Sequence, residues 1–112
     1  MRIIKEEVDL NAAQGTTWPA GDHYRVERFA HATLDMQLAG EPANAVIGIQ
    51  RSIDGNKWYP IPDMVELGKV GGQFIKITDP IDLGGHRFIR LRLKTAEGSP
   101  KTATVRVYLE KD

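Results

Sequence analysis

The stretch RFIRLRLKT, residues 87–95, alternates apolar and charged side chains along most of its length. On an extended strand Ile89, Leu91 and Leu93 share one face, and the residues between them, Arg90 included, share the other. A helix of the same sequence would scatter these charges around its circumference. The spacing therefore predicts a β-strand that buries one face and exposes the other to water.

The segment TATVRVYLEK, residues 102–111, repeats this alternation after a turn-rich connector at residues 96–101. Sequential antiparallel strands commonly pair, so we predict a hairpin between the two alternating segments. In such a hairpin Arg90, Arg92 and Arg106 lie on one outer surface. We predict that these three arginines form a contact patch for an acidic protein surface.

The same three arginines have a second interpretation. A solvated sheet face commonly carries cross-strand ion pairs, and Asp35 and Glu110 are candidate partners for such pairs. In that case Arg90, Arg92 and Arg106 would stabilise the sheet weakly and contact no other protein.

Other segments alternate in the same way, and Gly, Pro, Asp and Asn are frequent between them. The clearer ones are HATLDMQLAG (31–40), AVIGIQRSI (45–53) and GQFIKIT (72–78), and the weaker ones are RIIKEEVDL (2–10), HYRVERF (23–29) and KWYPIP (57–62). About eight short strands predict an all-β, single-domain antiparallel β-sandwich that is jelly-roll-like. An immunoglobulin-like sandwich is the alternative, since alternation does not supply the strand order.

Length and composition exclude several classes of protein. A chain of 112 residues fits one domain, residues 1–112, and 15 basic residues cancel 15 acidic ones. No net field draws such a chain to nucleic acid or to an anionic membrane, so we expect neither as a partner. The absence of cysteine excludes disulfides, thiolate metal sites and a cysteine nucleophile.

The N-terminal segment MRIIKEEVDL, residues 1–10, alternates apolar and charged residues. It has neither the apolar region of a signal peptide nor a run long enough to cross a membrane, so we expect no signal-directed export. The segment is predicted either as an ordinary first strand or as an arm that adds to the sheet of a neighbouring subunit.

The stretch RSIDGNKWYPI, residues 51–61, contains Asp54 and Gly55 directly before an aromatic pair. A calcium loop needs oxygen ligands at alternate positions over a longer run, and here Lys57 and Trp58 follow at once. Asp-Gly between apolar segments is instead a strong turn signal. We predict a structural turn at Asp54 and Gly55, with Trp58 anchoring the returning strand.

Three aromatic residues are candidates for contact with a ligand or partner. Trp18 lies in NAAQGTTWPAGD, an irregular loop over residues 11–22, where its ring must either tuck back or meet a partner; we predict it as an interface residue. Trp58 and Tyr59 are more typical of the edge of a core. A carbohydrate-binding module that stacks a glycan on Trp18, Trp58 and Tyr59 is the alternative.

Motifs that carry chemistry are missing from the sequence. No serine has a Gly-x-Ser-x-Gly setting, and His23, His31 and His86 have no spacing typical of a metal site. We therefore expect no enzyme, no cofactor and no metal. A small hydrolase is the third hypothesis, because fifteen carboxylates do not exclude an acid pair.

Two blocks of sequence together carry a family resemblance. QRSIDGNKWYPI (50–61) resembles the Ser-x-Asp-Gly-x-x-Trp hairpin, and HRFIRLRLKTAEGS (86–99) resembles the Arg-Phe/Tyr-Ile/Val-Arg-Leu/Ile-Arg strand. Both patterns recur in discoidin-like or galactose-binding-like β-sandwiches and in small virion proteins of tailed bacteriophages. The resemblance covers roughly residues 45–110. The chain is shorter than most discoidin-like domains and lacks their disulfides, so it resembles the phage proteins more closely.

This resemblance implies a non-enzymatic structural protein of the phage particle, most simply a capsid decoration or cement protein made in the host cytoplasm and located in the virion. A tail or adaptor component is the alternative. The implied partners are capsid or other virion proteins and further copies of the chain, for which a trimer is one arrangement. A glycan is the partner that the carbohydrate-binding hypothesis requires.

Overall fold

The structure is a computed structural model that describes residues 1–13, 15–18, 23–39, 45–60, 68–70, 73–77, 80–98 and 101–111. The secondary structure of these residues is entirely β. None of them forms a helix that is long and apolar enough to span a bilayer. The strands are β1 (Arg2–Asp9), β2 (Thr17–Trp18), β3 (Tyr24–Arg25), β4 (His31–Ala39), β5 (Val46–Ser52), β6 (Tyr59–Pro60), β7 (Gly68–Val70), β8 (Gln73–Ile77), β9 (Ile81–Asp82), β10 (Phe88–Thr95) and β11 (Thr102–Glu110).

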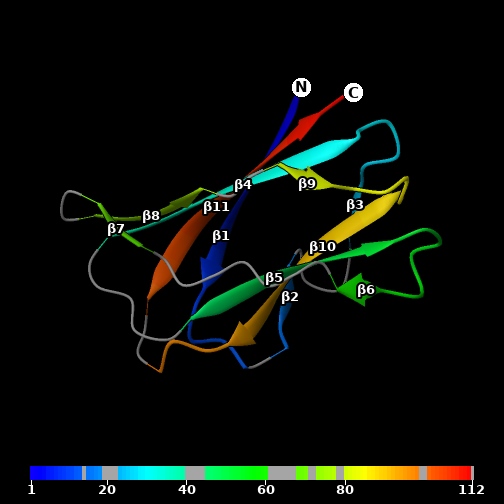
Figure 1. The fold of residues 1–112 in the computed structure, drawn as a ribbon. Helices are drawn as coiled ribbons and strands as arrows, with labels where there is room; N and C mark the ends of the chain where they lie inside the picture. Colours follow the sequence, from blue (N-terminus) through cyan, green and yellow to red (C-terminus); the bar gives the residue numbers. More distant parts are fainter. Residues whose placement is uncertain are drawn as a thin grey trace.

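The strands form two antiparallel sheets that lie face to face (Figure 1). The first sheet has the order β1-β11-β4-β8-β7, with β9 also paired to β4. The second sheet has the order β2-β10-β5-β6, with β3 also paired to β10. The predicted all-β antiparallel sandwich is thus confirmed.

The pairing of the strands is nested, which identifies the type of sandwich. Strands β8 and β9 pair with successive parts of one edge of β4 and act as one interrupted strand, and β2 and β3 do the same along β10. Counted in this way, the first strand pairs with the last, the second with the second last and the third with the third last, and the β5–β6 hairpin lies innermost. This is the eight-stranded order of a jelly roll, to which β7 is an addition at one edge.

The predicted hairpin between the last two long strands is wrong. β10 lies in the second sheet and β11 in the first, so the connector between them crosses from one layer to the other. Each strand still exposes the face that its alternation predicts. Arg106 therefore lies on the opposite outer surface of the sandwich from Arg90 and Arg92.

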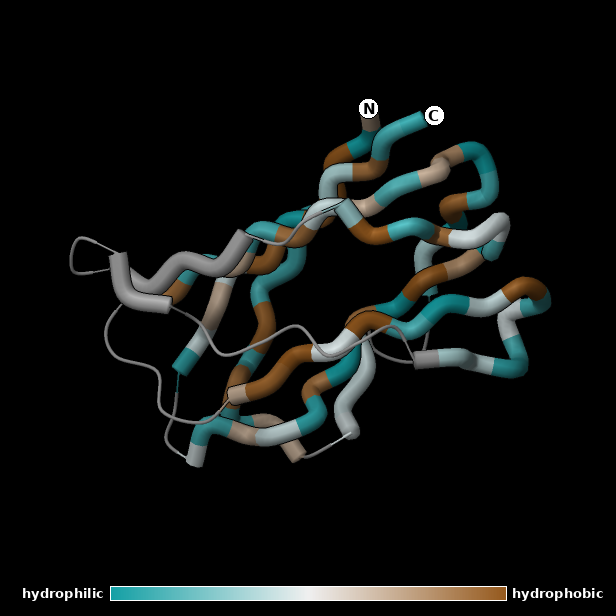
Figure 2. Tube along the Cα trace, in the orientation of Figure 1, coloured by the Kyte–Doolittle hydropathy of each residue, from teal (hydrophilic) through white to brown (hydrophobic). Residues whose placement is uncertain are grey.

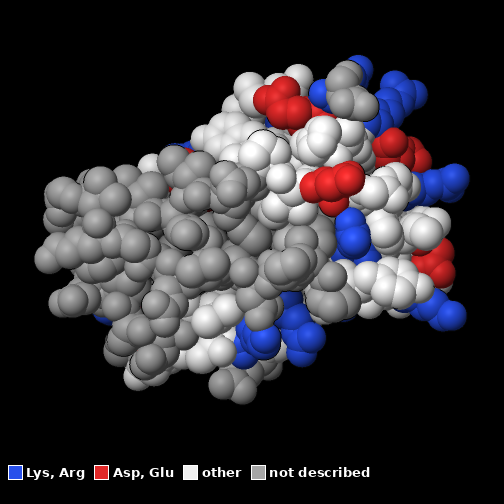
Figure 3. Space-filling model, viewed as in Figure 1, with Lys and Arg blue, Asp and Glu red and all other residues white. Residues whose placement is uncertain are grey.

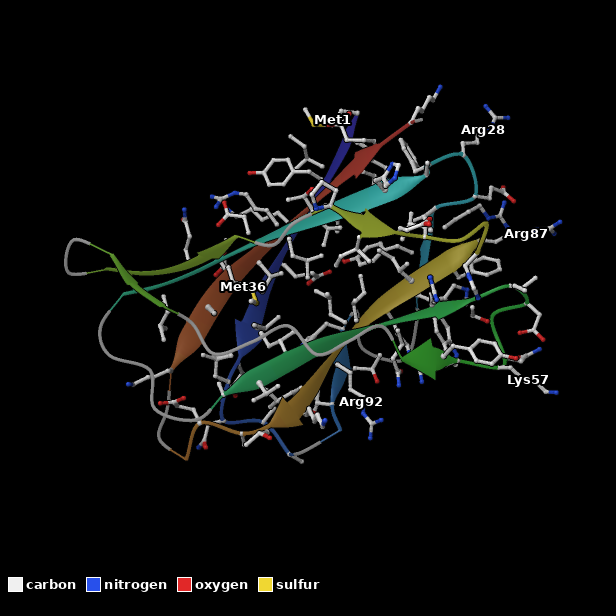
Figure 4. All side chains as sticks on the ribbon, viewed as in Figure 1. Met1, Arg28, Met36, Lys57, Arg87 and Arg92 are labelled. Carbon is white, nitrogen blue, oxygen red and sulfur yellow. The ribbon has the colours of Figure 1, made fainter. Side chains whose placement is uncertain are left out.

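The core fills the space between the sheets, where the apolar positions of the alternating segments meet (Figure 2). Met36 points into this space in Figure 4. Each fully buried aliphatic side chain contributes about 1.5–3 kcal/mol relative to an exposed one. The largest fully buried side chains are Leu10, Leu34, Met36, Ile49, Leu83, Ile89, Leu91, Leu93, Leu109, Val8, Val26 and Val105.

Residues 1–10 form the first strand of the jelly roll. All eight residues of β1 pair with β11, and Ile4, Val8 and Leu10 are buried in the core. Of the two interpretations of this segment, the ordinary first strand is the one that the structure shows within the chain.

A buried carboxylate holds the connector between β10 and β11. The side chain of Glu97 is 1% exposed, its Oε2 accepts a hydrogen bond from the Ala45 N–H at 3.0 Å, and its Oε1 lies 3.6 Å from Lys101 Nζ. The Glu97 backbone N–H donates to the Leu10 carbonyl at 2.7 Å. Glu97 therefore joins the start of β5 and the end of the β1 segment to the crossover.

We expect Glu97→Ala to lower the free energy of unfolding by about 2–3 kcal/mol, because the Ala45 N–H and the Lys101 ammonium lose their buried acceptor. Urea denaturation measures the change. Glu110→Ala, an exposed position at the end of β11, is the matched control and should stay within about 0.5 kcal/mol of the wild type. Equal stability of the two variants would contradict the role of Glu97.

A second carboxyl lies where the open edges of the two sheets approach each other. The Tyr24 hydroxyl of β3 donates a hydrogen bond to Glu6 Oε1 of β1. Partial burial raises the pKa of Glu6 above its ordinary value of 4.5. The folded protein thus holds this proton more tightly than the unfolded chain does.

Glu6 should make the protein less stable as the pH rises from 4.5 through its raised folded pKa. Glu6→Gln keeps an acceptor for Tyr24 and has no proton to lose, so we expect it to be more stable than the wild type at pH 7. The difference should shrink at pH 4 and below. Thermal melts of both proteins across this range measure it, and a constant difference would contradict the assignment.

Candidate interaction surface

The outer face of the second sheet carries a row of cations on β10. Because Ile89, Leu91 and Leu93 point into the core, the alternate positions Arg90 and Arg92 point outward. Arg90 lies directly opposite Gln50 of β5 in the antiparallel register. Cross-strand neighbours of this kind are close enough to contact each other.

Arg90 is held in place on both sides of its guanidinium group. Its Nε donates to Gln50 Oε1 at 2.7 Å, and its Cζ lies 4.2 Å from the centre of the Trp58 ring. A guanidinium stacked in this way gains a cation–π attraction. The pKa of Arg90 is lowered from its ordinary value, mainly by burial and to a smaller extent by the positive charge of Arg92.

Aromatic rings continue from this stack along the end of the sheet. The His23 ring lies 5.6 Å from Trp58 and 4.7 Å from Phe88, and Arg25 Cζ lies 5.9 Å from the Phe88 ring centre. The contacts run unbroken from one arginine to the other. We call this set the cation–aromatic cluster, and its members are His23, Arg25, Trp58, Phe88 and Arg90.

The loop between β5 and β6 places Trp58 over Arg90. Asp54 Oδ1 accepts hydrogen bonds from the Lys57 N–H at 2.9 Å and the Asn56 N–H at 2.8 Å, which lower the pKa of Asp54. Gly55 has a φ of 81°, a conformation that other residues rarely adopt. Asp54 and Gly55 thus form a turn, although the loop has six residues rather than two.

The predicted phase of β5 is wrong at its end. The alternating segment predicted over residues 45–53 would place Ile53 on the same face as Ile47 and Ile49, but β5 ends at Ser52 and Ile53 is exposed. Ser52 is fully buried instead, and its Oγ accepts a hydrogen bond from the Gly55 N–H at 2.8 Å. The turn therefore begins one residue earlier than alternation predicts.

Arg92 differs from Arg90 in having no hydrogen-bonding or ionic partner among the described residues. Its side chain is exposed and points away from the sandwich (Figure 4). The guanidinium of Arg92 lies over Gly15, because a Cβ added at Gly15 would be only 3.3 Å from it. In Figure 3 one group of lysine and arginine side chains lies low in the view, on the side of the second sheet, and others lie at the right-hand end among acidic residues.

Two ion pairs lie on the described part of the outer face of the first sheet. Lys5 Nζ lies 3.8 Å from Glu7 Oε1, and Thr104 Oγ1 donates to Glu7 at 3.0 Å. Arg106 Nη1 lies 3.8 Å from Asp35 Oδ2. Arg106 thus forms one of the cross-strand pairs that the alternative interpretation predicted, and it is not part of one patch with Arg90 and Arg92.

The tryptophan of the N-terminal loop is not exposed for contact. Trp18 is 9% exposed and belongs to the core, because β2 pairs with β10 so that Trp18 lies opposite the inward-facing Leu91. Of the two arrangements considered for this ring, the structure shows the one that tucks back, so the prediction of Trp18 as an interface residue is wrong. Residues 19–22 of the same loop lie outside the described residues.

The three aromatics of the carbohydrate hypothesis do not form one platform. The ring of Trp58 is covered by the Arg90 guanidinium, and Trp18 is in the core. Tyr59 is 49% exposed and contacts His86, with their ring centres 5.9 Å apart. Among the described residues there is also no group of three His, Asp or Glu side chains placed to hold a metal.

Comparison with known proteins gives few matches. No family model and no curated protein matches the sequence. Among solved structures, the SPBc2 prophage-derived protein YomS is 9% identical with a TM-score of 0.47, covering 96% of each chain. A protein of disulfide-linked pili from Bacillus endospore appendages is 11% identical with a TM-score of 0.34, covering 97% of this chain and 89% of that one.

A third solved structure is the IMPa metallopeptidase from Pseudomonas aeruginosa, which is 14% identical with a TM-score of 0.40. The match covers 98% of this chain but only 12% of the metallopeptidase. At such identities and TM-scores none of the three likenesses carries an argument about function. The functional argument rests on the residues themselves.

A double-mutant cycle tests the stack at the centre of the cluster. We expect Trp58→Ala and Arg90→Gln to be coupled by about 0.5–1 kcal/mol in the free energy of unfolding, since each removes the other's partner. Trp58→Ala and Arg92→Gln form the control cycle and should be additive within about 0.5 kcal/mol. Urea denaturation of the single and double variants gives both couplings, and equal couplings would contradict the stack.

Proposed function

We propose that this chain is a non-enzymatic structural protein of a bacteriophage virion, and that it decorates or cements the capsid. The two sequence blocks at residues 50–61 and 86–99 support the phage assignment through their resemblance to small virion proteins. The jelly-roll order adds a fold-level analogy, because viral capsid domains use this architecture, as lectin domains do.

The difference between the two outer faces is the observation that carries the proposal. Among the described residues of the first sheet, Arg106 is paired with the more buried Asp35, and Lys5 with Glu7 in an exposed and therefore weak pair. On the second sheet Arg92 has no such partner among the described residues, and it lies beside Arg90, which is stacked on Trp58. A positively charged face of this kind suits an acidic surface on neighbouring virion subunits.

The composition of this face is that of a protein interface. Arginine and aromatic residues are enriched at the centres of interfaces and carry much of their binding energy. Arg90 and Trp58 are already ordered by their mutual contact and by Gln50, so they lose little conformational freedom on binding. Arg92 remains to be ordered by the partner.

One face of this small domain offers limited area for binding, so a single copy would bind weakly. Several linked copies that bind at once would compensate for this weak affinity. Copies linked in an oligomer bind with an effective concentration that raises the overall affinity without new contacts. We therefore propose a homo-oligomer in the particle, for which a trimer is one closed arrangement. A tail or adaptor component would use the same face on a different virion protein.

Sedimentation with particles tests the proposal. The purified chain is mixed with capsids assembled without it and, separately, with isolated tails, and the pellets are assayed for the chain. We expect binding to capsids, and we expect Arg92→Glu to weaken it tenfold or more, about 1.4 kcal/mol, because a cation is replaced by an anion facing an acidic surface. Binding should also weaken as salt is raised.

Lys5→Glu is the matched control, because it reverses one exposed charge on the outer face of the first sheet and should leave capsid binding unchanged. Binding to tails and not to capsids would replace the decoration role with the tail role. A chain that pellets with neither particle would overturn the proposal, and equal binding by Arg92→Glu and the wild type would remove the second sheet's face as the contact.

A further inference from the structure

A small pocket lies at the end of the sandwich, apart from Arg92 of β10. It has a volume of about 290 Å³ and is lined by Arg2, Arg25, Glu27, Arg28 and Phe29. Figure 4 shows Arg28 at this end of the molecule, with Arg92 on the lower side of the second sheet. The pocket plays no part in the proposed capsid contact through Arg92.

The pocket lies where the start of β1, in the first sheet, is next to β3 at the edge of the second sheet. Arg2 occupies the same phase of β1 as the buried Ile4 and Val8, but it lies at the very start of the strand and is exposed. Its Nη1 donates to the Arg25 carbonyl of β3 at 2.9 Å. This bond fixes one guanidinium group across the gap between the sheets.

The charge of the pocket is strongly positive. Three guanidinium groups line it against the single carboxylate of Glu27, which lies 3.9 Å from Arg25 Nη1. The side chains of Arg25 and Glu27 are 71% and 41% exposed, and an ion pair so open to water contributes little. Glu27 therefore leaves most of the donors in the pocket available to an outside anion.

One wall of the pocket is apolar. Phe29 is partly buried and packs against the core, and it also lines the pocket. Arginines beside an aromatic ring suit a ligand that has a negatively charged end and a short apolar stem. The volume is just below the range typical of small-molecule sites, which indicates room for one side chain or chain terminus.

We propose that this pocket binds a carboxylate of a neighbouring protein chain, supplied either by a Glu or Asp side chain or by a C-terminus. Guanidinium groups match the planar, two-oxygen geometry of a carboxylate and bind it bidentately. Arg25 also lies over Phe88, so the pocket adjoins one end of the cation–aromatic cluster. The inference does not depend on the phage assignment, because a carboxylate would bind whichever protein supplied it.

NMR titration of the whole chain tests the inference with defined probes. The first is Ac-Ala-Glu-Ala-Ala-NH₂, the second is Ac-Ala-Ala-Ala-Phe with a free C-terminus, and the third is neutral Ac-Ala-Ala-Ala-Ala-NH₂. The signals to follow are the Nε–H groups of Arg2, Arg25 and Arg28 and the ring of Phe29. We expect saturable shifts with at least one of the first two probes and none with the neutral one.

Arg28→Gln should weaken that binding about tenfold, the effect of losing roughly 1.4 kcal/mol of charge-assisted hydrogen bonding. Lys57→Gln removes one exposed cation on the β5–β6 loop and should bind the peptide like the wild type. The preference between the first two peptides tells whether a side chain or a chain terminus is the ligand.

Three results would overturn the inference. They are shifts with the neutral peptide equal to those with the acidic ones, unchanged binding by Arg28→Gln, and tighter binding of inorganic phosphate than of either carboxylate peptide. The capsid assay is separate, because Arg92→Glu leaves all five pocket residues in place. A failure of either experiment can therefore be assigned to its own proposal.

Discussion

The pairing of β1 with β11 is the constraint on which the rest of the structure depends. It joins the first and last strands over eight residues and encloses every other pairing within it. For the pairing to exist, the chain must cross from the second sheet to the first between residues 95 and 102, and buried Glu97 holds this crossover to the start of β5. The core, the two outer faces and the open end of the sandwich all follow from that arrangement.

This arrangement also explains why the two surfaces of the protein differ. The crossover sends Arg106 to a sheet where Asp35 lies opposite, so its charge is compensated within the chain. Arg90 stays in the other sheet, where Gln50 and Trp58 order its guanidinium without neutralising it. Which strands share a sheet therefore determines which cations can still bind a partner protein.

Much of the fold follows from alternation along the strands, because a period of two assigns each residue to a face. Ile89 and Arg90 are correctly assigned from local sequence alone. Strand order is a property of distant segments, so local pattern could not separate Arg106 from Arg90, place Trp18 opposite Leu91, or bring His23 beside Trp58. For Gln50 a signal existed, since it alternates with Ile49, but its contact with Arg90 required the register between β5 and β10.

Nested pairing has a consequence for how the chain reaches its native state. The β5–β6 hairpin joins neighbouring segments, whereas each surrounding pair joins segments that are farther apart in the sequence. The entropic cost of closing the loop is therefore larger for each outer pair. We expect the Asp54 turn to be among the earliest structures and the β1–β11 pairing to be the last, in a process that takes roughly milliseconds to seconds, as is usual for non-local β folds. The cation–aromatic cluster, which needs only the inner strands and β3, would then form before the two ends of the chain meet.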